Sequence, residues 1–145
     1  MYQEQIPLLP PTPATLPGAT PEPLIYPPSP GEAVEALFNA MKVAKALNIS
    51  ARMEGYTLKG VHLAPRTDHV WLIMDYEEVS FSIYSVIHAG VDDVDYCIKY
   101  AEQLSEAYDR TGRWDTEIVP VIVAEEVDED AETYAKTLEI PVFRV

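Results

Sequence analysis

Hydrophobic and polar positions change their spacing several times along the chain, and each change predicts a different element. Residues 34–47 repeat apolar side chains at helical spacing, behind a capping box and a proline at residues 29–32. We therefore expect a first helix that ends near Asn48. Residues 52–63 form a weaker extended stretch that two glycines interrupt.

Two strands joined by a tight acidic turn are expected next. The continuous apolar run at residues 70–74 is typical of a buried central strand, and residues 79–86 alternate apolar and polar side chains. The spacing then becomes helical again until Gly112. Asp92 or Asp93 is the expected cap of this second helix.

The last part of the chain predicts a strand, a helix and a strand. Residues 118–124 suit a buried strand, which tolerates Pro120 only near its start or at a sheet edge. Acidic residues favour the start of a helix at residues 128–138, and residues 140–145 supply a final short strand. Short links make the first three strands an antiparallel meander, whereas helical crossovers require parallel pairing. We therefore expect a three-layer α/β fold with the order α-β-β-β-α-β-α-β and a mixed sheet.

Composition divides the chain into two parts. Ten of the thirteen prolines lie in residues 1–30, and this density favours extended polyproline II over helix or central strand. Large apolar residues are interspersed among the prolines, so we interpret the segment as an arm that docks on its own domain, a sister subunit or a partner. A floppy leader is the plain alternative. Residues 31–145 are expected to form a single α/β domain.

The net charge of −14 and the isoelectric point near 4.4 narrow the choice of partner. Affinity for phosphates comes mainly from Lys and Arg, so nucleic acid is not expected as the main ligand. A basic protein surface or a protein assembly fits the charge, and self-association through the arm is a further option. The alternative is that the negative charge serves only to keep the protein soluble.

The chain shows no sign of a membrane or secretory protein. No apolar run reaches the roughly 18 residues that a span needs, and no secretion signal is visible. Cys97 is the only cysteine, and it falls on the apolar stripe of the second predicted helix. We expect a buried, inert thiol and a cytoplasmic or otherwise intracellular protein, with a virion component as one option.

The element order and hydrophobic pattern of residues 32–145 resemble the restriction-endonuclease-like PD-(D/E)XK superfamily. The part from Asp93 onward is most similar, and it looks like the end of archaeal and phage members. In that superfamily an Asp on the second core strand and an acid-x-Lys motif on the third hold Mg²⁺ and position the attacking water. The resemblance implies that Asp68 matches the Asp, Ser82 the acid and Tyr84 the lysine. Serine and tyrosine cannot do that work, so the motif is degenerate.

A migrated active site is the alternative that this resemblance leaves open. Asp68, Asp75 and Lys99 are then the candidate catalytic residues, with Asp68 as the candidate metal ligand and Mg²⁺ as the cofactor. Further candidate carboxylates are Glu77, Glu78, Asp92, Asp93, Asp95 and Glu102. The plain interpretation is that these are turn, cap and surface residues.

Neither the histidines nor two charged regions of the chain predict a specific catalytic or metal site. The histidines are too scattered to predict zinc. Residues 125–132 are acidic and form either a solvated helix start or a contact surface for a basic groove. Arg52, Lys59 and Arg66 fall in the predicted meander and are the one candidate positive patch.

We therefore expect a non-catalytic acidic interaction protein on a nuclease-like scaffold, with no cofactor. Its partner would be a protein or an assembly, for example the basic channel of a machine that handles nucleic acid. The alternative function is a Mg²⁺-dependent nuclease with a migrated active site.

Overall fold

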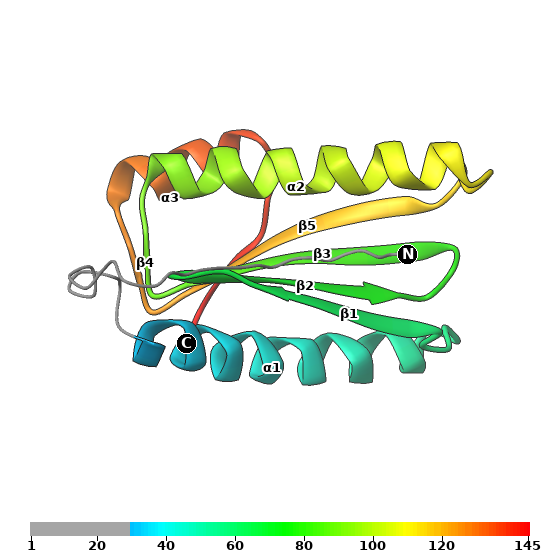
Figure 1. The fold of residues 1–145 in the computed structure, drawn as a ribbon, viewed down its shortest axis with the longest axis horizontal. Coiled ribbons are helices and arrows are strands. Elements are labelled where there is room, and N and C mark those ends of the chain that lie inside the picture. Colours follow the sequence, from blue (N-terminus) through cyan, green and yellow to red (C-terminus); the bar gives the residue numbers. More distant parts are fainter. Residues whose placement is uncertain (1–29) are drawn as a thin grey trace, which may run out of the picture.

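The computed structural model describes residues 30–145, so the predicted arm lies outside the described residues except for Pro30. The described part has three layers (Figure 1). Helix α1 (Pro30–Met53) covers one face of a five-stranded sheet, and α2 (Val91–Arg110) and α3 (Glu129–Thr137) cover the other. The predicted three-layer α/β fold is confirmed.

The sheet is mixed, as expected, with the strand order β1-β2-β3-β5-β7. Its strands are β1 (Gly60–Pro65), β2 (His69–Asp75), β3 (Val79–Val86), β5 (Glu117–Ala124) and β7 (Val142–Arg144). The first three strands pair antiparallel, and β3, β5 and β7 pair parallel. The predicted meander and the predicted parallel crossovers are therefore both confirmed.

Two short strands were not predicted. They are β4 (His88–Ala89) and β6 (Glu126–Val127), which pair in parallel just before α2 and α3 begin. They keep the register in which β3 pairs with β5. A two-residue strand is too short to leave a periodic signal in a sequence.

The first helix is longer than predicted. It continues past Asn48 to Met53, and Ala51 in its last turns is buried in the core. Asn48 lies inside the helix, and its side-chain oxygen accepts a 2.7 Å hydrogen bond from the Tyr76 hydroxyl. Gly55, with a φ of 95°, takes the left-handed conformation that glycine tolerates best and turns the chain away. The predicted extended stretch thus shortens to β1.

The inner face of α1 was predicted only in part, since Ala44 and Leu47 of the predicted stripe do pack against the core. Small residues face the sheet, namely Ala36, Ala40, Val43 and Ala51. The larger Val34, Phe38 and Met41, which the helical stripe had placed inside, are about half exposed. Small side chains let the helix lie close to the sheet, and the larger ones form a second apolar row on its outer surface.

Two cores fill the space on the two sides of the sheet. Leu72 and Ile83 pack under α1, whereas Tyr84, Cys97 and Ile122 pack under α2 and α3. Neighbouring residues of β3 separate in this way because side chains alternate across a strand. Burial raises the pKa of the Cys97 thiol to about 12, so the predicted buried, inert thiol is confirmed. Within residues 30–145 no helix combines the length and apolar character that crossing a bilayer requires.

Pro120 lies at a free sheet edge, as its chemistry required. Strand β7 pairs only with the last three residues of β5, so residues 117–121 have no strand on that side. The Ile122 amide donates toward β7, to the Pro141 carbonyl, and Pro120 therefore faces the same side. Because proline has no N–H, it removes one donor from the exposed edge.

Candidate functional site

The candidate site is the face of β2 and β3 that lies toward α2, because Ser82 and Tyr84 are on it. Trp71 pairs with Tyr84, Ile73 with Ser82 and Asp75 with Ser80, so the even residues of β3 share this face with the odd residues of β2. The face divides into two halves. One is filled by aromatic rings and is named the closed half, and the other is an open groove.

Five rings define the closed half: His69, Trp71, Tyr84, Tyr96 and Tyr100. The Trp71 ring stacks on Tyr100 with 4.5 Å between centroids, and His69 stacks on Tyr84 at 4.8 Å. Tyr96 and Tyr100 come from adjacent turns of α2 and reach down to the sheet. The sequence analysis missed this cluster, although the four-residue spacing of the two tyrosines was its one visible signal.

The hydroxyls of Ser82 and Tyr84 both form hydrogen bonds inside the closed half. The Trp71 indole nitrogen donates to the Ser82 hydroxyl at 2.9 Å, and the Tyr84 hydroxyl donates to Asp93 at 2.5 Å. Both side chains are 1% exposed. Burial, followed by the hydrogen bond to Asp93, raises the pKa of Tyr84, so its hydroxyl stays neutral. Neither position offers a negative or a positive charge.

The N-cap of α2 is Gly90 rather than the predicted Asp92 or Asp93, and Asp93 lies in the first turn, where its side chain completes the cap. Its second carboxylate oxygen accepts a 2.8 Å hydrogen bond from the Gly90 amide, which lies immediately before the helix. Asp93 therefore joins the start of α2 to the buried Tyr84. A carboxylate held by two donors has less capacity left for a metal ion.

Asp68 lies at the rim of the closed half. Its side chain is more than half exposed, and it lies 2.9 Å from the His69 ring nitrogen Nδ1. The other ring nitrogen of His69 lies 2.8 Å from the Tyr100 hydroxyl. Asp68 thus extends the hydrogen-bonded chain of the closed half to the surface.

Asp75 lies at the opposite end of β2 from Asp68. Seven residues at about 3.3 Å each put the two positions about 23 Å apart, so they cannot share a metal ion. Arg113 binds the Asp75 carboxylate with two hydrogen bonds of 2.7 and 2.9 Å. Burial alone would raise the pKa of Asp75, but the bonds from Arg113 and from the Glu77 amide outweigh it and lower that pKa.

Lys99 lies on α2 near the closed half. It is exposed, and its ammonium is 5.8 Å from the centroid of the Tyr96 ring, which in turn stacks on His69. The structure therefore brings Lys99 and Asp93 toward the same half as Asp68 and leaves Asp75 outside it. Among residues 30–145 no three His, Cys, Asp or Glu side chains gather closely enough to hold a metal ion. Ser82 and Tyr84 supply no carboxylate and no ammonium, so these two side chains do not fit the acid and the lysine of the superfamily motif.

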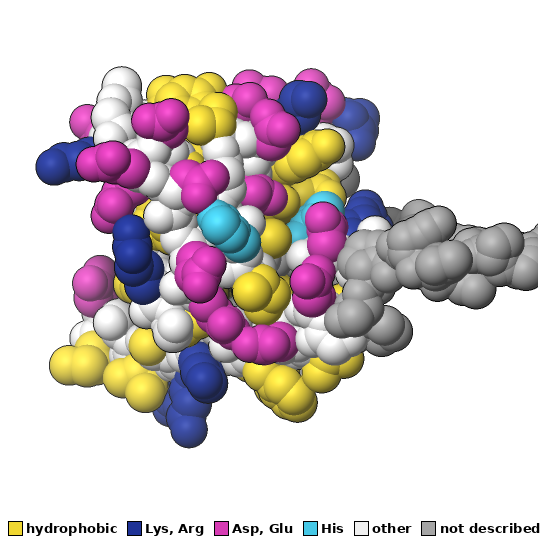
Figure 2. Space-filling model, turned by 90° about the vertical axis from the view of Figure 1, so that its left-hand side faces the viewer, with side chains coloured by type: hydrophobic (Ala, Val, Ile, Leu, Met, Phe, Trp, Pro, Cys, Tyr) yellow, Lys and Arg dark blue, Asp and Glu magenta, His cyan; other side chains and the backbone are white. Residues whose placement is uncertain are grey.

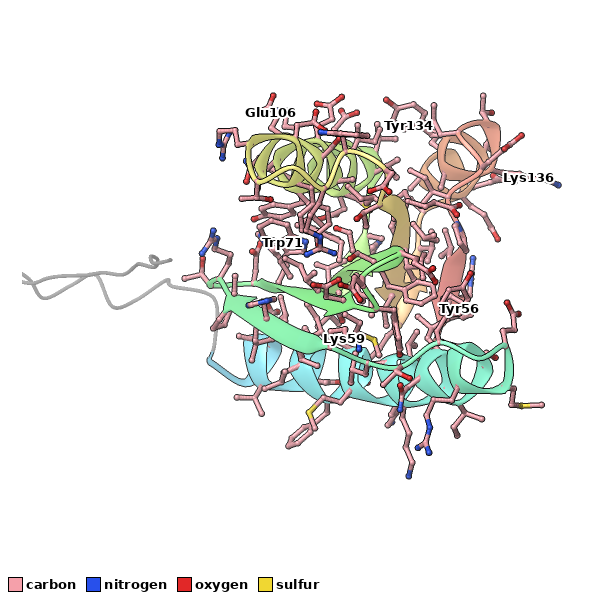
Figure 3. All side chains as sticks on the ribbon, turned by 90° about the vertical axis from the view of Figure 1, so that its right-hand side faces the viewer. Tyr56, Lys59, Trp71, Glu106, Tyr134 and Lys136 are labelled. Atoms are coloured by element: carbon pink, nitrogen blue, oxygen red, sulfur yellow. The ribbon has the colours of Figure 1, made fainter. Side chains whose placement is uncertain are left out.

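The second half of the face is a groove with a volume of about 810 Å³. It exists because α2 packs over β3 and β5 and leaves β1 and β2 uncovered on this side. Figure 3 shows Trp71 in the space between α2 and the strands. The groove is lined on the sheet by Ala64, Trp71 and Ile73, on α2 by Leu104, Ala107 and Tyr108, and at its rim by His62, Gln103, Glu106 and Arg110.

One end of the groove is closed by Arg113, which the sequence analysis also missed. The Arg113 guanidinium lies 4.1 Å from the centre of the Tyr108 ring while it binds Asp75. The Tyr108 hydroxyl lies 2.8 Å from the Ser80 hydroxyl. These contacts fix the aromatic wall of the groove, and they leave Arg110 as a rim cation.

Acidic side chains gather at the end of the molecule where α2 and α3 begin (Figure 2). A shallow hollow there is lined by Asp92, Asp93, Asp128, Glu129 and Asp130. His88 lies 2.6 Å from Asp128 and 3.5 Å from Glu126, and the bond to Asp128 raises the pKa of His88. Acids at helix starts are stabilised by the helix dipole, which explains part of this acidic end.

The predicted positive patch does not form. Arg52 is in the last turn of α1 rather than in the meander. Lys59 and Arg66 flank the two ends of β1, which are about 20 Å apart. Three cations that lie so far apart do not make one binding surface.

Comparisons with known proteins find only distant likeness. The sequence matches no protein-family model and no curated protein. The fold is similar to a solved structure described as EndoMS in apo form (15% identity, TM-score 0.47) and to a repair endonuclease from Pyrococcus abyssi (15% identity, TM-score 0.42). Each match covers 73% of this chain and 45% of the other, so the chain spans less than half the length of either structure.

Proposed function

We propose that this chain is a non-catalytic interaction protein on a restriction-endonuclease-like scaffold. The observation that carries the proposal is the state of Ser82 and Tyr84. Both are buried and hydrogen-bonded to protein partners at the positions where the superfamily needs an acid and a lysine. A metal-dependent nuclease of this superfamily needs charge at those positions, and Ser82 and Tyr84 supply none.

A cleavage assay tests the absence of catalysis. The full chain is incubated with single- and double-stranded DNA and RNA in the presence of Mg²⁺ or Mn²⁺, beside an Asp68→Ala variant. We expect wild type and variant to give the same background. Metal-dependent cleavage by the wild type that is absent in the Asp68→Ala variant would contradict the proposal.

A migrated nuclease site is the second candidate function. The observation in its favour is that Asp68, Asp93 and Lys99 lie toward the same half of the face. The negative charges of Asp93 and Asp68 both contribute to raising the pKa of the Tyr84 hydroxyl. If this candidate holds, Lys99→Met abolishes cleavage while Lys136→Met, a change at an exposed lysine of α3, leaves it intact.

The proposed partner is a basic protein surface, such as the channel of a machine that handles nucleic acid. The acidic end supports this choice, because its hollow is lined by five carboxylates and no Lys or Arg. Oppositely charged surfaces attract at long range, and the attraction weakens as salt rises.

Binding to a fluorescent oligolysine peptide tests the charge complementarity. We expect Asp92→Asn/Glu129→Gln/Asp130→Asn to weaken binding more than Glu102→Gln/Glu106→Gln/Asp109→Asn. Both variants remove three negative charges, so only the location differs. Equal losses would show that the net charge, not the acidic end, attracts the peptide.

A further inference from the structure

We propose that residues 6–11 of the proline-rich arm occupy the groove between β1 and α2 of the same chain. This assignment goes beyond the proposed function, because it concerns a different surface. It starts from the groove itself, in which Trp71 and Ile73 of β2 form an apolar floor and Leu104 of α2 lies on the wall.

The chemistry of the groove matches the chemistry of the arm. Grooves lined by aromatic side chains bind proline-rich segments, because such segments already hold the extended polyproline conformation and lose little entropy on binding. Trp71 and Tyr108 supply aromatic lining here. Residues 6–11 read Ile-Pro-Leu-Leu-Pro-Pro and carry no charge, so no charged side chain has to be desolvated.

Charge favours the groove over the acidic end. Residues 1–29 contain two glutamates and no Lys or Arg. The groove lining balances Arg110 and Arg113 against Asp75 and Glu106, so its formal charge is zero. The hollow at the acidic end carries five carboxylates and would repel the arm.

The outer row of α1 is the competing surface. Val34, Phe38 and Met41 are about half exposed there, and the row follows the convex surface of a helix. A convex row offers contact on one side only, whereas the groove has a floor and a wall. More of each proline ring is therefore removed from water in the groove.

The arm is long enough to reach the groove from its own helix. Residues 12–29 in extended polyproline form would span about 56 Å. The groove lies on the far side of the sheet and beneath the C-terminal half of α2, whereas α1 begins at the end where α2 starts (Figure 1), so the path is roughly 20 Å across the layers and about 20 Å along the sheet. A tether of this length keeps the arm at a high effective concentration, which favours its own groove over that of a second copy.

A spin label on the arm tests the assignment in the full chain. Thr12→Cys places the label beside residues 6–11, and buried Cys97 stays unlabelled. We expect the label to broaden the NMR signals of the Trp71 indole and of the Ala64, Gln103 and Ala107 amides. The amides of Phe38 and Met41 on α1 should keep their intensity.

Two controls make each outcome decisive. Leu8→Asp/Leu9→Asp should abolish the broadening, whereas the matched change Leu16→Asp/Leu24→Asp in the tether should leave it. A mixture tests for contacts between chains. It contains an isotope-labelled chain without the spin label and a spin-labelled chain at natural isotope abundance, and it should show no broadening. Broadening at α1, broadening only in the mixture, or no broadening at all would each overturn the assignment.

Discussion

The closed half and the groove lie side by side under the same helix and on the same face of the sheet, the closed half over β2 and β3 and the groove over β1 and β2. In the closed half, tyrosines from the N-terminal part of α2 fill the space above β2 and β3. In the groove, the smaller Ala107 and the rim residues of the C-terminal part of α2 leave about 810 Å³ empty. The difference shows how side-chain size along one helix can close a site at one end and leave a binding surface at the other.

The largest difference between the two regions should appear when a ring is removed from the closed half. Tyr84→Ala deletes a fully buried ring and removes one of the two donors to Asp93, so we expect a loss of about 4 kcal/mol in the free energy of unfolding. Tyr96→Ala, at the half-exposed rim, should cost about 1 kcal/mol or less. Urea denaturation of both variants measures this, and similar losses would mean that the closed half is not tightly packed.

Adding side-chain volume, instead of removing it, should also distinguish the dense core beneath α2 from the groove. Cys97→Leu adds volume to the dense core beneath α2 and should cost about 2 kcal/mol. Ala107→Leu adds more volume at the groove and should change stability by no more than about 0.5 kcal/mol. A large loss in the Ala107→Leu variant would show that the wall of the groove is packed as tightly as the core.

The Asp75–Arg113 pair holds the end of the groove and should contribute less. Arg113 is 30% exposed, so we expect Arg113→Met to lower the free energy of unfolding by about 1.5 kcal/mol. Because the pKa of Asp75 is lowered on folding, the stabilisation is present above pH 4 and is lost as pH falls through the folded pKa. Denaturation at pH 7 and at pH 3 checks this, since the wild-type advantage should shrink at the lower pH. An advantage that does not change with pH would contradict the pairing.

The smallest expected effect on stability concerns the interaction of His88 with the acidic end. Its pKa is raised on folding, so any stabilisation is present below about pH 6.5 and is lost as pH rises through the folded pKa. An NMR titration should place the His88 midpoint higher in the wild type than in an Asp128→Asn variant. Equal midpoints would show that the 2.6 Å contact does not persist in solution.

The sequence predicted the order of elements because strand and helix periods are strong signals in buried segments. The run at residues 70–74 and the alternation at residues 79–86 each led to a real strand. The prediction failed in part at α1, where apolar residues lie on two opposite faces and a helical stripe cannot tell which one meets the sheet. That choice depends on how closely the helix approaches the strands, which is a tertiary property.

The site was less predictable than the fold. The part of Asp93 in capping α2 follows from local sequence, whereas its bond to Tyr84 depends on how α2 crosses β3. The pairing of Asp75 with Arg113 joins residues 38 positions apart, and no local pattern encodes it. Asp68 and Asp75 looked like neighbours in the sequence, but a straight strand carries them to opposite ends of the sheet.

A Mn²⁺ titration followed by NMR tests most directly whether the closed half has lost metal chemistry. Bound Mn²⁺ broadens nearby amides, so a metal site at the superfamily position would affect Ser82 and Tyr84 first. We predict that Ser82 stays sharp while the acidic end, such as Glu129 and Asp130, broadens weakly through its exposed carboxylates. Tyr84 is bonded to Asp93 of that end, so it should broaden no more than the acidic end does. Selective broadening of Ser82 and Tyr84 that disappears in the Asp68→Ala variant would contradict the account.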